Sequence, residues 1–204
     1  MNEITLDSTI ARWLVRELST PIDLESIWLS PQTAIRIDQM AEKIFSSPEA
    51  ARGRTFEKVR EDCIHGKLGE LAIVRRLERA GMHVVWNVEK ESGQYFWDVS
   101  ADGYLLELKA QSRYDANGNP RQFFSFSEED MHRMVTPMSR WRDFHAIIAW
   151  VLVASEVRPW FLIDASMLNP ELKYWVQSNY KSGGRYLQMG KVRSAGGLRS
   201  LCSI

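Results

Sequence analysis

Cysteine is scarce in this chain of 204 residues, where Cys63 and Cys202 are the only two. Two cysteines are too few for a disulfide framework or a cysteine-based zinc site. The sequence also lacks an apolar run near the roughly 18 residues that a membrane-spanning helix requires. Its first residues lack the basic and apolar regions of a secretory signal. These absences predict a cytoplasmic protein with no membrane partner.

The sequence has no excess of charge of either sign, because 26 basic residues balance 26 acidic ones. The distribution is nevertheless uneven, since residues 173–204 hold basic side chains and no acidic one, with tyrosine and tryptophan interleaved. Clustered cations with aromatic neighbours suit contact with phosphates and stacking on bases. The alternative is a solvated basic tail. The residues expected to bind nucleic acid are Lys181, Arg185, Lys191 and Arg193.

The hydrophobic pattern predicts an α/β (α+β) fold with a central mixed β-sheet flanked by helices, in a single domain 1–204. Residues 1–55 are predicted to be a helical extension, and a long helix follows from Phe56 to Ala80, before Gly81. A capping box at Ser127 and Asp130 predicts a further helix. Another helix is expected at 170–180, and strands are expected at 83–88, 95–101, 104–111, 145–154 and 160–163.

The dipeptide Asp102-Gly103 is a strong hairpin signal, and pairing outward from it places Asp98 opposite Glu107. Lys109 and Gln111 follow Glu107 on the same face of the second strand. Opposed residues have Cβ atoms about 4.5–5.5 Å apart. At an effective dielectric of about 20, two carboxylates at this separation repel by about 3 kcal/mol. A stable fold therefore needs a positive charge between them.

A third acid, Glu70, lies on the apolar stripe of the long helix, where an unpaired glutamate is rare. If this helix packs on the hairpin, Glu70, Asp98, Glu107 and Lys109 carry a formal charge of −2. One divalent cation would balance it, and oxygen ligands favour Mg²⁺ or Mn²⁺ over zinc. The alternative is a half-solvated hairpin with surface charges, in which Glu70 pairs with a lysine.

This combination of residues resembles the PD-(D/E)xK nuclease superfamily, which has a restriction-endonuclease-like fold. The matching residues are Gly69-Glu70 on a helix, Asp98 at a strand end and Glu107-Leu108-Lys109 on the paired strand. The similarity covers about residues 63–163 and includes the order helix, three strands, helix, strand. Trp97 stands where the superfamily name has proline. The resemblance implies a nuclease core at 56–165, followed at 166–204 by a C-terminal helix and basic tail.

The resemblance implies a Mg²⁺-dependent DNA endonuclease that leaves a 5′-phosphate and a 3′-hydroxyl, with Mn²⁺ able to replace Mg²⁺. Asp98, Glu107 and the backbone carbonyl of Leu108 would hold the metal, and Glu70 would complete the acidic cluster.

Two further residues receive roles from the resemblance. Lys109 would orient or deprotonate the attacking water and offset charge in the transition state. Gln111 would contact the scissile phosphate.

Several functions stay open at this point. A non-catalytic nucleic-acid-binding or assembly module on the same fold is the main alternative. Within the nuclease class, a structure-specific or exonucleolytic enzyme of recombination or repair is another, because one fold hosts many functions. A homodimer would allow both strands to be cut, and the residues do not decide the oligomeric state.

Overall fold

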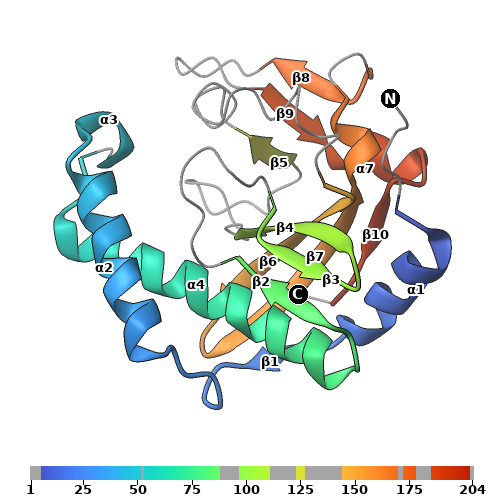
Figure 1. Ribbon diagram of the computed structural model, residues 1–204. Coiled ribbons are helices and arrows are strands. Elements are labelled where there is room, and N and C mark those ends of the chain that lie inside the picture. Colours follow the sequence, from blue (N-terminus) through green and yellow to red (C-terminus); the bar gives the residue numbers. More distant parts are fainter. Residues whose placement is uncertain are drawn as a thin grey trace.

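Helices flank a curled, mixed β-sheet in the computed structural model (Figure 1). The structure describes residues 6–51, 53–87, 97–110, 123–126, 144–169, 172–177 and 185–202. The predicted mixed sheet with flanking helices is confirmed at this level. Within these ranges, no helix is both long enough and apolar enough to cross a membrane.

The helices begin at residues with side chains suited to capping. Asp7 accepts hydrogen bonds from the amides of Thr9 and Ile10, and Ser30 accepts one from the amide of Thr33. Thr55 does the same for Lys58 at the start of the long helix. The described helices are α1 (Ser8–Glu17), α2 (Pro31–Phe45), α3 (Pro48–Ala51), α4 (Phe56–Arg79), the 3-10 helix η2 (Ala165–Leu168) and α7 (Met189–Ser194).

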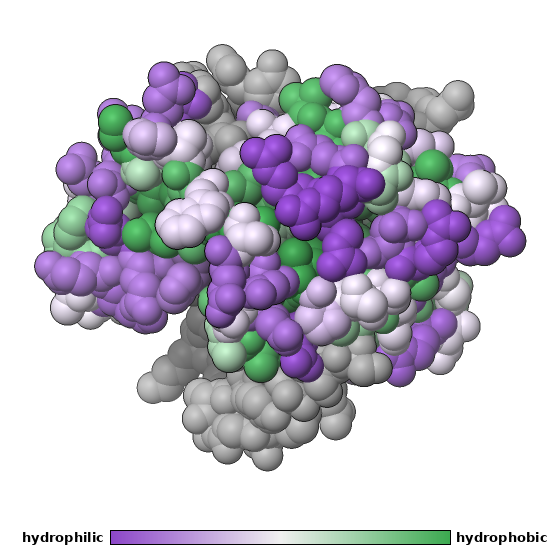
Figure 2. Space-filling model, turned by 90° about the horizontal axis from the view of Figure 1, so that it is seen from below, coloured by the Kyte–Doolittle hydropathy of each residue, from purple (hydrophilic) through white to green (hydrophobic). Residues whose placement is uncertain are grey.

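Helix α4 matches the predicted helix 56–80 and joins the amino-terminal segment to the sheet. Its Arg60 pairs with Asp38 of α2 at 2.6 Å. The guanidinium of Arg76 donates to the backbone carbonyls of Glu17 and Pro21, both at 3.1 Å. Seen from below, the surface is mostly hydrophilic, with small apolar patches (Figure 2). Buried apolar residues such as Leu14 of α1, Ile37 of α2 and Leu77 of α4 face inward.

Among the described residues, the main sheet has seven strands in the order β1-β7-β6-β4-β3-β2, with β10 also paired to β7. Strands β2, β3 and β4 form an antiparallel meander, β6 runs parallel to β4, and β7 runs antiparallel to β6. The bounds are β1 (Ile22–Asp23), β2 (Val84–Trp86), β3 (Val99–Ala101), β4 (Tyr104–Ala110), β6 (Ala146–Val153), β7 (Glu156–Asp164) and β10 (Leu198–Ser200).

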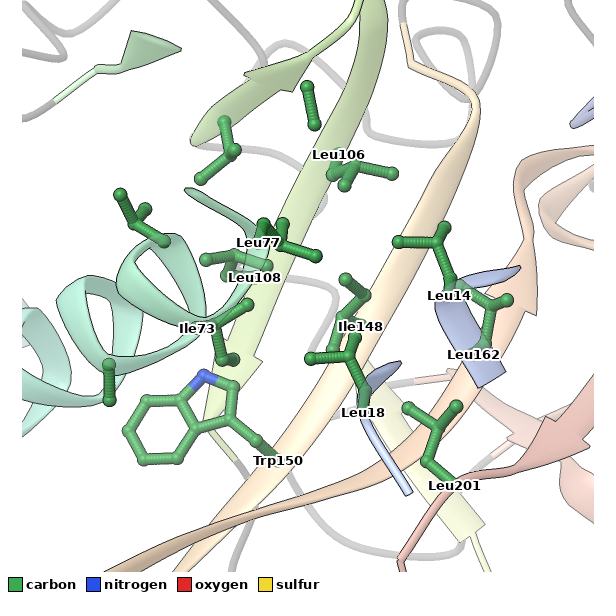
Figure 3. Close-up of a cluster of buried hydrophobic side chains, with 14 of the residues drawn as sticks. Leu14, Leu18, Ile73, Leu77, Leu106, Leu108, Ile148, Trp150, Leu162 and Leu201 are labelled. Atoms are coloured by element: carbon green, nitrogen blue, oxygen red, sulfur yellow. The ribbon is translucent and has the colours of Figure 1, made fainter. Parts of the chain in front are cut away.

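Both faces of the main sheet are covered by buried apolar side chains. On one face, Figure 3 shows residues of α1 and α4 meeting those of β4 and β6, among them Leu14, Ile73, Leu106 and Ile148. The opposite face carries a second cluster that includes Ile147 of β6 and Val192 of α7. Strand β6 is therefore buried on both sides, as its continuous apolar run predicts.

The first part of the amino-terminal segment, α1 and β1, packs with the main sheet, whereas α2 packs on α4. Leu14 and Leu18 of α1 are buried in the first cluster. Ile22 of β1 pairs with Val157 of β7, so the segment also completes an edge of the main sheet. The apolar faces of α1 and α2 match the sequence prediction, and the packing of α1 and β1 against the sheet is an addition to it.

The carboxyl-terminal segment corrects the prediction of a helix followed by a basic tail. Residues 175–177, predicted as part of a helix, form strand β8 (Trp175–Gln177). In the described part of the chain, β8 joins β9 (Arg185–Gln188) and β5 (Phe123–Phe126) in a three-stranded sheet. Leu187 and Val192 are buried, and β10 returns to the main sheet. Burial of these apolar residues overrides the solvated-tail interpretation, and Trp175-Val176 is a pair of residue types that suits strands.

The predicted helix that begins near the capping box cannot be compared with the structure. Ser127 and Asp130 lie outside the described residues.

Candidate functional site

The hairpin between β3 and β4 has the predicted turn and register. Asp102 and Gly103 both have positive φ angles, 48° and 83°, as a two-residue turn matched to the strand twist requires. The aligned pairs are Ala101 with Tyr104, Ser100 with Leu105, and Val99 with Leu106.

Asp98 lies one residue beyond this ladder, so it is not the ladder partner of Glu107. Its amide donates to the carbonyl of Leu106 at 2.9 Å, and its own carbonyl accepts from the amide of Asn87 at 2.8 Å. The backbone of Asp98 therefore bridges β4 and β2, the kind of irregularity that a bulge produces. Its Oδ2 accepts a hydrogen bond from the amide of Leu108 at 2.7 Å. The Asp98 carboxylate thus contacts the backbone between Glu107 and Lys109.

Glu107 and Lys109 share a face of β4, as predicted. Both are half-buried and alternate with Leu106 and Leu108, which are buried in the cluster that contains α4. Side chains alternate along a strand, so Glu107 and Lys109 lie on the opposite face of the sheet. Their partners on β6 there belong to the second cluster and are Ile147 and Ala149.

Glu70 is buried on α4, as its place on the apolar stripe predicts, and is 8% exposed. It is held by a lysine. Lys67 Nζ lies 2.9 Å from Oε1 and 2.6 Å from Oε2 of Glu70, and Lys67 is itself 8% exposed. Trp86 Nε1 donates to Oε2 at 3.1 Å. The pairing of Glu70 with a lysine, which the sequence left open, is therefore present.

Glu70 and Asp98 are near enough to affect each other electrostatically. Burial raises the pKa of Glu70 above its usual range, the Lys67 ammonium partly offsets this, and the Asp98 carboxylate raises the pKa further. Lys67, Glu70 and Asp98 together carry a formal charge of −1. Adding Glu107 and Lys109 leaves that sum at −1, because the sequence expectation of −2 did not include Lys67.

The oxygen donors at this point suit a hard divalent cation. In the part of the chain that the structure describes, no three His, Cys, Asp or Glu residues are placed to hold a metal together. The neighbouring carboxylates are the pair Glu70 and Asp98, with Glu107 on the other face of β4. The N–H of Leu108 points toward Asp98, and the N–H and C=O of a strand residue share an edge, so its carbonyl also faces that edge. Two carboxylates and a carbonyl fit Mg²⁺, which keeps several waters.

The residues predicted to contact nucleic acid are described in part. Gln111 and Lys181 lie outside the described residues, and the side chain of Arg185 is not described. Lys191 and Arg193 are exposed on α7. The guanidinium carbon of Arg193 lies 5.9 Å from the ring centroid of Phe161. Helix α7 packs in the second cluster, so it covers the sheet face that carries Glu107 and Lys109.

Sequence reasoning missed three residues of this site. Lys67 precedes Glu70 by three positions, a spacing at which helical side chains meet, so charge spacing could have found it. Trp86 and Asn87 come to the site through the pairing of β2 with β3, which no short motif records. Within the described structure, Nδ2 of Asn87 is buried without a hydrogen-bond partner.

Comparison with protein-family models and with curated proteins gives no match for this chain. The chemistry of the site is therefore inferred from its own residues.

Proposed function

We propose that the protein is a Mg²⁺-dependent DNA endonuclease of the PD-(D/E)xK type with a restriction-endonuclease-like core. The observation that carries this proposal is the contact of the Asp98 carboxylate with the amide of Leu108, beside the buried carboxylate of Glu70. The contact brings Glu70 of α4, Asp98 just before β3 and the backbone of Leu108 in β4 close together, which supports the proposal. The succession of α4, the β2–β4 meander and the parallel strand β6 supports the same fold.

The metal would be held by Glu70, Asp98 and the carbonyl of Leu108, whereas Glu107, the fourth ligand expected from the sequence, lies on the other face of β4. When bound, it would supply charge stabilisation to the phosphoryl oxygens and lower the pKa of a bound water. The Leu108 amide fixes the orientation of Asp98, so this ligand is preorganised.

Lys109 contributes an ammonium group next to the strand segment that Asp98 contacts. Lys109 lies on the face of β4 opposite Glu70, so its ammonium would reach the attacking water around the edge of β4 that Asp98 contacts. From that edge it would orient the water and offset negative charge that develops on the phosphorus oxygens. Attack of water forms a new P–O bond and breaks the bond from phosphorus to the 3′ oxygen. The products are a 5′-phosphate and a 3′-hydroxyl.

The exposed cations of α7 support nucleic acid as the substrate. Lys191 and Arg193 lie on the helix that covers the sheet face of Glu107 and Lys109. Cations there would contact phosphates on either side of the cleaved bond and contribute affinity independent of base sequence.

The test is incubation of the protein with supercoiled plasmid in Mg²⁺, Mn²⁺, Ca²⁺ or excess EDTA. Cleavage is expected with Mg²⁺ and Mn²⁺ only, and Ca²⁺ is expected to permit binding without turnover. Linear, single-stranded and branched DNA in the same assay separate endonucleolytic, exonucleolytic and structure-specific cutting. Undiminished cleavage in EDTA would refute metal dependence.

A non-catalytic nucleic-acid-binding module is the second candidate, and the Lys67–Glu70 pair is the observation that favours it. A lysine that neutralises Glu70 is compatible with a site that holds no metal. DNA binding without cleavage of any substrate, under every metal condition, would support this module and refute the nuclease.

A further inference from the structure

Lys67 forms a buried ion pair with Glu70 but has no part in the proposed reaction. Lys67 Nζ contacts both carboxylate oxygens of Glu70, and the two side chains are 10% and 11% exposed. The same helix has a lysine–glutamate pair at the same spacing, Lys58 with Glu61 at 3.0 Å, in which both side chains are about half exposed. The two pairs differ in burial and in their further contacts, because Lys58 Nζ also lies 3.2 Å from Asp62 and Glu70 also accepts from Trp86.

A buried ion pair needs a reason beyond stability. Removing two charges from water costs free energy that their attraction often fails to recover, and apolar residues of similar size are frequently as stable. Asp98 adds to this cost, because its carboxylate is a second negative charge near Glu70. Without a cation, the site would hold the neighbouring carboxylates of Glu70 and Asp98, two residues that are 8% and 4% exposed as a whole.

The contacts of Glu70 also restrict how a metal can reach it. Lys67 occupies both oxygens, and Trp86 Nε1 additionally donates to Oε2. A metal ion that binds Glu70 directly therefore has to share these oxygens with the ammonium group or displace it, and repulsion between the two cations favours displacement. Lysine suits such an exchange, because its side chain is a flexible four-carbon stem that carries a compact charge.

We propose that Lys67 is a built-in counter-cation, which neutralises Glu70 in the metal-free protein and releases it when a divalent cation binds. The inference rests on the proposed function, because it assumes that Glu70 is a metal ligand. It makes Lys67 a positioning residue that competes with the metal for Glu70. The competition lowers metal affinity, and the lysine keeps the metal-free fold stable.

The test measures Mn²⁺ binding by electron paramagnetic resonance, together with thermal melting with and without Mn²⁺. Lys67→Met is expected to bind Mn²⁺ at least about tenfold more tightly than the parent, because the competing ammonium is gone. Its metal-free melting temperature should fall, and saturating Mn²⁺ should raise it by more than in the parent. Lys67→Arg retains the charge and should keep Mn²⁺ affinity close to that of the parent. Lys58→Met is the matched control and should leave both measurements unchanged, because its pair is exposed.

A second variant covers the case in which Lys67→Met does not fold without metal. Lys67→Gln retains a hydrogen-bond donor for Glu70 and removes the charge, so it should show the same tighter binding with a smaller loss of melting temperature. Asp98→Asn identifies the site, because it should abolish Mn²⁺ binding and leave the resonance signal of free Mn²⁺ undiminished.

The outcomes separate this inference from the proposed function. If Asp98→Asn abolishes Mn²⁺ binding but Lys67→Met and Lys67→Gln bind no more tightly than the parent, the role of Lys67 is refuted and the metal site stands. If neither the parent nor these variants bind Mn²⁺, both proposals are refuted.

Discussion

The carboxylate of Asp98 lies 2.7 Å from the amide nitrogen of Leu108, so the side chain of the residue just before β3 satisfies a backbone donor of β4. The ladder of β3 on β4 ends at Val99 and Leu106, and Leu108 lies beyond it. A buried N–H without an acceptor is costly, and Asp98 takes the place that a longer β3 would have occupied. Asp98 therefore has a structural role in addition to its proposed chemical one.

Asp98→Ala and Asp98→Asn are expected to separate these roles. The alanine variant leaves the Leu108 amide without an acceptor, at a cost of about 1–3 kcal/mol, partly offset by relieved repulsion with Glu70. The asparagine variant keeps an acceptor oxygen, so its free energy of unfolding, measured in urea, should be close to that of the parent. Both variants should lose metal-dependent cleavage. Equal destabilisation of the two variants would show that the hydrogen bond is not the structural contribution of Asp98.

Lys109→Ala is expected to slow DNA cleavage by at least about 100-fold while DNA affinity changes little, because its ammonium acts on the reacting phosphate rather than on the polymer. Single-turnover cleavage and a binding titration in Ca²⁺ measure the two effects separately. Lys173→Ala, at an exposed lysine, is the control. Cleavage by Lys109→Ala at the parental rate would remove this residue from the chemical step.

A double substitution of Lys191 and Arg193 by glutamine tests the role of α7 in binding. Each lost phosphate contact should reduce the slope of log affinity against log salt by about one unit, so a reduction of about two units is expected. Arg193 also lies over Phe161, so melting of the variant must show that the fold is kept. An unchanged salt slope would mean that these cations are only solvated.

Gly69→Ala is expected to destabilise the protein, whereas Gly66→Ala on the same helix should not. A Cβ at Gly69 would overlap the indole ring of Trp150, which is 2% exposed and has little room to move. Overpacking of this kind costs about 1–3 kcal/mol. A Cβ at Gly66 meets no atom within 4 Å, so alanine there should stabilise the helix by up to about 1 kcal/mol. Urea unfolding of the two variants gives the comparison, and equal stabilities would contradict the tight packing of Trp150 on α4.

A lower pH is expected to weaken the hydrogen bonding between Leu105, near the start of β4, and His145, just before β6. The amide of Leu105 donates to Nδ1 of His145 at 3.0 Å, and the amide of His145 donates to the carbonyl of Leu105 at 2.8 Å. Burial lowers the pKa of His145 below 6.5, although the carboxylate of Asp164 acts in the opposite direction. Because the unfolded chain takes up this proton first as the pH falls, the free energy of unfolding should decrease below the ordinary pKa.

The measurement is urea unfolding at about pH 7.5 and about pH 5.5, on either side of that ordinary value. The parent should lose more stability between these conditions than His145→Asn, which cannot become protonated in this range. An identical loss in both proteins would assign the pH dependence to other groups.

The parts of the fold set by local chemistry could be predicted from the sequence. Asp102-Gly103 supports positive φ at both positions, and this turn fixes the pairing of Val99 with Leu106. The burial of Glu70 follows from the period of the helix that carries it.

The parts that depend on tertiary contacts could not be predicted. The departure of Asp98 from the ladder depends on the segment after β2. There the amide of Asn87 donates to the carbonyl of Asp98, while the Asp98 side chain accepts from the amide of Leu108. The strand at Trp175 has three residues, and its partner β9 is itself paired with β5, which is distant in sequence. The three-residue spacing of Lys67 and Glu70 allows their pairing on a helix. Which lysine pairs with a buried glutamate nevertheless depends on the packing of the whole fold.

Strand β7 has its outer edge covered at both ends by distant parts of the chain. Ile22 and Asp23 pair with its beginning, and residues 198–200 pair with its end. An uncovered edge of this apolar strand would offer free backbone groups to another molecule, the usual start of edge-to-edge aggregation. During synthesis, β7 emerges from the ribosome well before residues 198–200, which pair with the end of its outer edge. A nascent chain halted between residues 164 and 198 should therefore be prone to self-association and be a favoured target for chaperones.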